Sequence, residues 1–180
     1  SQKPHFAMKK LLSLTALCIV LLTLSTTKAT AQAYQNGRNY LNAGIGLGTY
    51  GGGGLGLNAS LEHGFTDQIS AGGIVAYSRY NVGFSDWRWN FIMFGARGSY
   101  HLTELLNINN DKLDLYAGLG LGYRAGSYTG PGASYVGTLG SGVFFMGHVG
   151  ARYFFSENVG GFAEAGAGVS NLLLGVTFKF

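Results

Sequence analysis

Few side chains in this chain could support catalysis or metal binding. After residue 33 the histidines are His63, His101 and His148, which lie far apart in the sequence, and no cysteine follows residue 33. A zinc site needs ligands at close spacing, and nucleophilic catalysis needs a hydroxyl or thiol beside a base, for which Ser141 near His148 is the best pairing. The sequence therefore predicts no metal site, no catalytic residue and no cofactor.

Four charged residues carry a stronger signal, because they lie within otherwise apolar segments. They are two acids and two bases whose charges cancel: Glu62, Arg97, Arg152 and Glu164. A charge that leaves water has to be paired or hydrated. We predict that the four form one structural ion-pair cluster in which Glu164 faces both arginines. A gated path for protons or ions is the alternative use of such a cluster.

The elements that must position these charges read as β-strands. After residue 33 no segment shows sustained apolar recurrence at three and four residues, whereas period-two alternation recurs in segments of about ten residues with turn residues between them. Backbone groups in lipid must pair within a closed ring, and a tilted membrane strand needs about 9–11 residues. The predicted fold is an all-β, transmembrane, eight-stranded antiparallel up-and-down β-barrel. Its strands are expected at 40–50, 54–64, 69–79, 89–102, 113–123, 142–155, 159–169 and 171–180.

Strand parity predicts which side chains face lipid. The outward sets are free of charge, and a basic residue at mid-membrane depth would cost about 2–4 kcal/mol, so Arg97 and Arg152 must point inward. Val169 is expected on the lipid face of its strand. Aromatic girdles are expected at the two membrane interfaces. One girdle consists of Tyr40, Tyr100 and Tyr153, and the other of Tyr50, Trp87, Trp89 and Tyr123.

The start of the chain indicates export. Met8 is followed by two lysines, an apolar run at 11–24, and small-residue cleavage sites that end at Ala31 and Ala33. This is the order of regions in a secretory signal peptide. The apolar run is 14 residues long, which is short for a membrane-spanning helix of about 20 residues. We predict cleavage after one of these two alanines.

The predicted domain organisation determines which part of the chain carries the net positive charge. We assign 1–7 to an upstream remnant, 8–33 to the signal peptide and 34–180 to the barrel domain. Four of the 12 basic residues and none of the 8 acidic residues precede residue 34, so the net charge of +4 belongs to the leader. The basic balance is therefore no argument for a nucleic-acid partner.

Several segments together carry a resemblance to known proteins. They are 113–123, 150–155, 164–168 and 175–180. From about residue 40 onward the chain resembles the small eight-stranded outer-membrane barrels, the family of OmpX and the OmpA transmembrane domain. The resemblance implies an integral protein of the bacterial outer membrane that is inserted by the barrel-assembly machinery, with Phe178 and Phe180 as part of the assembly signal.

The expected function follows from a barrel of this size. Eight strands enclose a lumen that side chains can fill. We expect a monomeric, non-enzymatic barrel in contact with outer-membrane lipid and lipopolysaccharide, with a structural or surface-interaction role and no nucleic-acid partner. A surface ligand would bind at the Gly/Tyr/Ser-rich loop 124–141. The alternatives are a lipid-modifying outer-membrane enzyme, a narrow gated pore and, for the architecture, a soluble lipocalin-like barrel.

Overall fold

The structure is a computed structural model that describes residues 32–49, 54–81, 88–130, 133–136 and 140–180. These residues belong to one compact unit, Ala31–Phe180. Within these ranges, none of the chain forms a helix long and apolar enough to cross a membrane.

The described residues form nine strands, and every pairing between them is antiparallel. They are β1 (Asn39–Thr49), β2 (Leu55–Gly64), β3 (Ile69–Asn81), β4 (Arg88–His101), β5 (Leu113–Gly130), β6 (Ala133–Val136), β7 (Gly142–Phe154), β8 (Val159–Ala167) and β9 (Ser170–Lys179).

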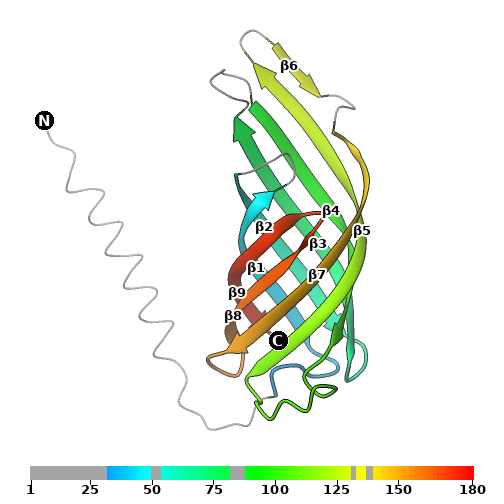
Figure 1. Cartoon of the computed structure of the whole chain (residues 1–180), viewed down its shortest axis with the longest axis vertical. Helices are drawn as coiled ribbons and strands as arrows, with labels where there is room; N and C mark the ends of the chain where they lie inside the picture. Colours follow the sequence, from blue (N-terminus) through cyan, green and yellow to red (C-terminus); the bar gives the residue numbers. More distant parts are fainter. Residues whose placement is uncertain (1–31, 50–53, 82–87, 131–132, 137–139) are drawn as a thin grey trace, which may run out of the picture. The chain divides into compact units, whose positions relative to one another are not determined.

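Eight of these strands close into a ring of tilted strands, which Figure 1 shows. Each strand pairs with its neighbour in the order β1, β2, β3, β4, β5, β7, β8 and β9, and β9 returns to β1. The last pairing is continued by the backbone of Asn39, which donates to the Phe180 carbonyl at 2.8 Å and accepts from its N–H at 3.0 Å. Among the described residues the predicted eight-stranded antiparallel barrel is confirmed.

The ring has two different ends. We call the end with the short connections 65–68 and 155–158 the turn end, and it also carries the segment Gln32–Arg38 that leads into β1. The opposite end is called the loop end. In an outer-membrane barrel, short turns face the periplasm and longer loops face outward.

The segment predicted as an outer loop at 124–141 is in part a hairpin. β5 continues past its predicted end at Tyr123 as far as Gly130, pairing with β4 up to Arg88↔Thr129. β6 then pairs back onto β5 alone. Tyr and Thr residues favour extended structure, and here β4 supplies the partner that prolongs the strand.

Between its two ends the outward face of the ring is apolar, as parity predicts, but one residue assigned to this face lies inside. Large side chains such as Leu57, Phe94 and Leu119 are exposed there, as lipid-facing groups must be. Val169 is not among them, because it is only 5% exposed. β8 ends at Ala167 and Gly168 has φ of 103°, so the chain turns before Val169 and directs it inward.

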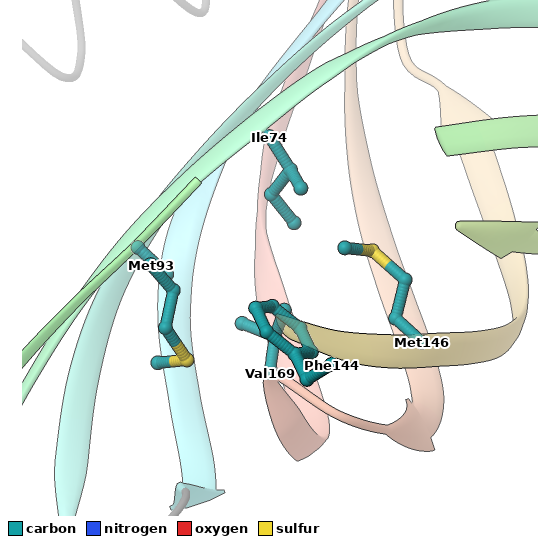
Figure 2. Close-up of a cluster of buried hydrophobic side chains, with 6 residues drawn as sticks. Ile74, Met93, Phe144, Met146 and Val169 are labelled. Atoms are coloured by element: carbon teal, nitrogen blue, oxygen red, sulfur yellow. The ribbon is translucent and has the colours of Figure 1, made fainter. Parts of the chain in front are cut away.

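Side chains fill the described interior in two zones. In the half toward the loop end lies an apolar cluster, part of which Figure 2 shows. It comprises Ile74, Ala76, Met93, Phe144, Met146 and Val169. In the half toward the turn end the buried residues are mainly charged and hydrogen-bonded, and this half holds the candidate site.

Candidate functional site

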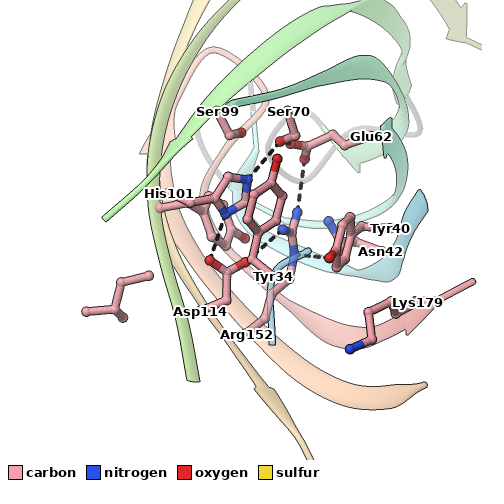
Figure 3. Close-up of polar contacts among 12 residues, drawn as sticks. Tyr34, Tyr40, Asn42, Glu62, Ser70, Ser99, His101, Asp114, Arg152 and Lys179 are labelled. Atoms are coloured by element: carbon pink, nitrogen blue, oxygen red, sulfur yellow. Dashed lines mark hydrogen bonds and ion pairs between the residues drawn. The ribbon is translucent and has the colours of Figure 1, made fainter. Parts of the chain in front are cut away.

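Arg152 on β7 is the centre of the buried polar network in the turn half (Figure 3). Its side chain is 0% exposed. Its Nη1 donates to Asp114 Oδ2 at 3.1 Å, and its Nη2 donates to Glu62 Oε1 at 3.1 Å. Its Nε donates to Asn42 Oδ1 at 3.2 Å, and the Tyr116 ring lies 4.3 Å from its Cζ. Every face of this guanidinium therefore meets an acceptor or a ring.

Arg97 on β4 holds the second part of the network. It donates to Glu164 in bidentate fashion, from Nη1 to Oε1 at 3.1 Å and from Nη2 to Oε2 at 2.7 Å. Its Nε lies 3.1 Å from Glu62 Oε1, so Glu62 joins both guanidiniums. The Tyr116 hydroxyl also donates to Glu164 Oε2, at 3.1 Å. The two arginines and three carboxylates thus form one connected network.

Strand register brings these residues together. Asp114 and Arg152 are direct cross-strand partners on β5 and β7. Glu62 and Arg97 are separated by β3, where Gly72 lies in register with both. A Cβ at Gly72 would collide with the backbone of Leu61, so glycine there permits the close approach of the strands.

Four of these charges lie inside, as strand parity predicts, but the predicted partner of one arginine was wrong. Glu164 was expected to face both arginines, whereas its carboxylate is bound by Arg97 and no described contact joins it to Arg152. Asp114 was missed, although it follows outward-facing Leu113 and therefore has inward parity. That parity was the available signal for it.

Two of the predicted interface aromatics lie elsewhere. Tyr40 is 0% exposed, and its ring lies 5.2 Å from the Arg152 guanidinium, inside the barrel. Trp89 is half-buried on the inner face, where it stacks on Phe91 and contacts Tyr128. Both residues occupy inward-facing positions of their strands. This position, and not the aromatic residue type, determines which way their side chains point.

The other predicted interface and assembly-signal aromatics lie on the outer face wherever the structure describes them. Tyr100, Tyr123 and Tyr153 are exposed on the outer face. Phe178 and Phe180 are also exposed at the turn end of β9. The predictions for Tyr50 and Trp87 lie outside the described residues.

Three buried residues of the turn half have the arrangement of a hydrolase triad. Ser70 Oγ lies 2.9 Å from His101 Nε2, and His101 Nδ1 lies 2.7 Å from Asp114 Oδ1. This is the order of nucleophile, base and orienting carboxylate that recurs on unrelated folds. The sequence offers no sign that Ser70 and His101 meet, because the two residues lie 31 positions apart.

The surroundings of this triad oppose catalysis. The Ser70 hydroxyl is 0% exposed and donates to Glu62 Oε2 at 2.8 Å. The Tyr34 ring stacks on His101 with centroids 3.4 Å apart. A cavity of 240 Å³ at the turn end is lined by Tyr34 and His101, but Ser70 does not line it. A substrate carbonyl therefore has no place beside the hydroxyl.

The segment Gln32–Arg38 closes the turn end over this network. The Tyr34 hydroxyl bonds the carbonyls of Thr66 and Ile69, each at 2.8 Å. Lys179 Nζ donates to the Gln32 carbonyl at 2.8 Å. Burial, followed by the Asp114 carboxylate, raises the pKa of Tyr34 to about 12. The hydroxyl therefore remains a donor well above neutral pH.

The other histidines belong to local contacts. His148 Nε2 lies 2.9 Å from Ser99 Oγ in the interior, and His63 Nδ1 lies 2.9 Å from Asn39 Oδ1 at the turn end. Within the described ranges, no three His, Cys, Asp or Glu residues are grouped to hold a metal ion. Within the described residues, His148 and His63 therefore form hydrogen bonds that join one strand to another, and neither belongs to a group of metal ligands.

Comparison with solved structures gives the fold of this chain. OprG of Pseudomonas aeruginosa has a TM-score of 0.59 at 12% identity, over 83% of this chain and 98% of that one. Ail of Yersinia pestis, in complex with the heparin analogue sucrose octasulfate, has 0.53 at 15%, over 81% and 100%. The N-terminal β-barrel domain of Pseudomonas aeruginosa OprF has 0.51 at 17%, over 81% and 98%.

The search of family models found no match, and neither did the search of curated proteins. The likeness to solved structures therefore concerns the fold alone. What the site can do is inferred from the arrangement of its own residues. That geometry is a ring of eight strands with an apolar outer face and charges paired inside it. The chain therefore has the fold of the small eight-stranded transmembrane β-barrels.

Proposed function

We propose that the protein is a sealed barrel of the outer membrane whose role is structural or surface-interacting, without transport or catalysis. The observation that carries this proposal is that buried side chains occupy both halves of the described interior. Arg152 and its partners occupy the turn half, and Phe144 and Met146 with their apolar neighbours occupy the loop half. An eight-stranded barrel has room for little beyond its own side chains.

Conductance in planar bilayers tests the seal. The purified monomer should give no steady channel of porin size. The double variant Arg97→Ala and Arg152→Ala, which removes both guanidiniums from the turn half, should show increased ion leakage in its folded fraction. The matched variant Arg38→Ala changes an exposed arginine at the turn end and should remain silent. Large, long-lived channels from the wild-type monomer would contradict the proposal.

The proposal extends to export and assembly. A signal peptide at 8–33 would direct the chain out of the cytoplasm, and the contacts of Gln32 and the burial of Ala33 favour cleavage after Ala31 over cleavage after Ala33. Sequencing the N-terminus of protein extracted from membranes distinguishes the two sites. Cleavage after Ala33 would remove the Gln32 carbonyl that Lys179 binds.

The exposed aromatic end of β9 supports recognition by the barrel-assembly machinery. Phe178 and Phe180 are accessible on the outer face. We expect the double variant Phe178→Ser and Phe180→Ser to lower the yield of membrane-inserted protein while refolding into detergent is retained.

The hairpin of β5 and β6, within 124–141, is the region that we assign to contacts with a surface ligand, because it extends beyond the ring at the loop end (Figure 1).

A further inference from the structure

The outer face of β3, β4 and β5 changes abruptly from apolar to polar near the loop end. One row across these strands consists of Tyr77, Ile92 and Ala125, which are in register. The next outward row toward the loop end consists of Arg79, Asn90 and Ser127. This change from one row to the next marks the edge of the lipid-facing band that lies toward the loop end.

Two exposed arginines stand at this edge. Arg79 pairs directly with Asn90, and Arg88 is the next outward residue on the strand of Asn90, so the arginines are diagonal neighbours, about 7–8 Å apart at the backbone. No ion pair of either arginine occurs among the described residues. The described acids lie in the interior network or at the turn-end connections.

Asn90 is held between the two arginines. The Tyr77 hydroxyl donates to Asn90 Oδ1 at 3.0 Å, which fixes the side-chain amide and leaves its Nδ2 donors available. Two guanidiniums and an amide N–H thus share one outward face. Such a group of donors suits a phosphate, and guanidiniums bind phosphate oxygens in bidentate fashion.

We propose that Arg79, Asn90 and Arg88 bind a phosphate of a lipopolysaccharide molecule in the outer leaflet. The location favours this ligand, because the donors lie directly above an apolar surface on which acyl chains can pack. The phosphorylated glycolipid would place its acyl chains on Ile92 and Phe94 and its phosphate among the donors. This site goes beyond the proposed function, because it does not depend on whether the interior is sealed.

Binding in zwitterionic detergent micelles tests the site. Labelled wild-type protein is titrated with lipopolysaccharide, and the double variant Arg79→Gln and Arg88→Gln should bind about 25-fold more weakly, since each basic residue at an anionic membrane surface contributes about fivefold. Arg38→Gln is the matched control, because it removes an exposed arginine at the turn end. Heat-modifiable gel mobility verifies that each variant is folded. Equal affinity of the double variant and the wild type would overturn the proposal.

A second measurement requires only the wild-type protein. Lipopolysaccharide from which the lipid A phosphates have been removed keeps its acyl chains and should bind much more weakly than the native form. Equal binding of both forms would show that acyl chains alone are recognised and would overturn the site. Binding of phosphatidylglycerol as tight as that of native lipopolysaccharide would overturn its assignment to the glycolipid.

Discussion

The two halves of the barrel interior are filled by opposite means. In the turn half, Arg152 and Arg97 are held by three carboxylates at distances of 2.7–3.1 Å. In the loop half, Met93, Met146 and Phe144 pack in an apolar cluster, against which the Arg124 guanidinium lies with its Cζ 5.4 Å from the Phe144 ring centre. Ion pairs have defined partners and directions, whereas apolar contacts depend mainly on volume.

This contrast predicts how each half responds to substitution. Removal of one partner from a buried ionic network leaves a charge without compensation. A cluster rich in methionine can adjust to a change of shape, because methionine is flexible and unbranched. The turn half should therefore depend on residue identity and the loop half on residue size.

The largest effect is expected for Arg152→Met. It leaves the Glu62 and Asp114 carboxylates without their shared cation, and the loss of one partner of a buried ion pair costs about 3–5 kcal/mol. Urea unfolding in lipid vesicles measures the change. Arg38→Met, at an exposed position, should alter the stability by less than about 0.5 kcal/mol.

A smaller loss is expected for Glu164→Gln, because Arg97 keeps its contact with Glu62. The double variant Glu164→Gln and Arg97→Met should recover part of this loss, since it also removes the cation that Glu164 neutralises. Combining Glu164→Gln with Arg152→Met should give no comparable recovery. The same unfolding assay distinguishes the two double variants, and equal coupling in both would mean that the pairing is not the one described. Glu157→Gln in an exposed turn is the control for the single change.

Tyr34→Phe tests the closure of the turn half. It removes the hydroxyl that bonds the carbonyls of Thr66 and Ile69, and unpaired acceptors of this kind cost about 1–3 kcal/mol. The pKa of Tyr34 is raised from 10.0 to about 12, so the unfolded chain ionises first as the pH rises. The stabilising contribution of Tyr34 should be fully present below pH 10.0 and lost between pH 10.0 and about 12.

The free energy of unfolding of Tyr34→Phe is compared with that of the wild type over that pH range. The difference between them separates the contribution of Tyr34 from those of the other tyrosines. The wild type should lose stability more steeply than the variant between the two pKa values. Parallel pH profiles would show that the Tyr34 hydroxyl does not titrate differently in the folded protein.

The smallest effect is expected for Met146→Leu in the apolar cluster. The two side chains have similar volumes, and such exchanges usually cost less than about 1.5 kcal/mol. The comparison with Arg152→Met in the same unfolding assay is the sharpest measure of the difference between the halves. A loss as large as that of Arg152→Met would refute it.

Parity along the strands was enough to predict the ring and the inward direction of Arg97, Arg152 and the two glutamates. It could not predict which groups pair, because a long side chain can reach across the lumen and the partner depends on the curvature of the ring. Arg152 illustrates this: Glu164 on the neighbouring strand β8 was its predicted partner, but Arg152 binds Glu62 on β2, which is not a neighbour of β7.

The errors at Tyr40 and Val169 have separate causes. Tyr40 was assigned to a girdle because of its aromatic type, although alternation along its strand gives this position the inward parity. Val169 was placed by extending the alternation of β8, which in fact ends at Ala167 before the turn at Gly168. Alternation predicts facing only within one continuous strand.

The pairing of β1 with β9 has a consequence for the order of folding. Tyr40 and Lys179 are cross-strand partners although most of the barrel lies between them in sequence. Until β9 is available, β1 presents an unpaired edge that can join other chains. Contacts of such long range also make folding slow. A barrel of this topology therefore needs protection from aggregation until its final strand has paired with β1.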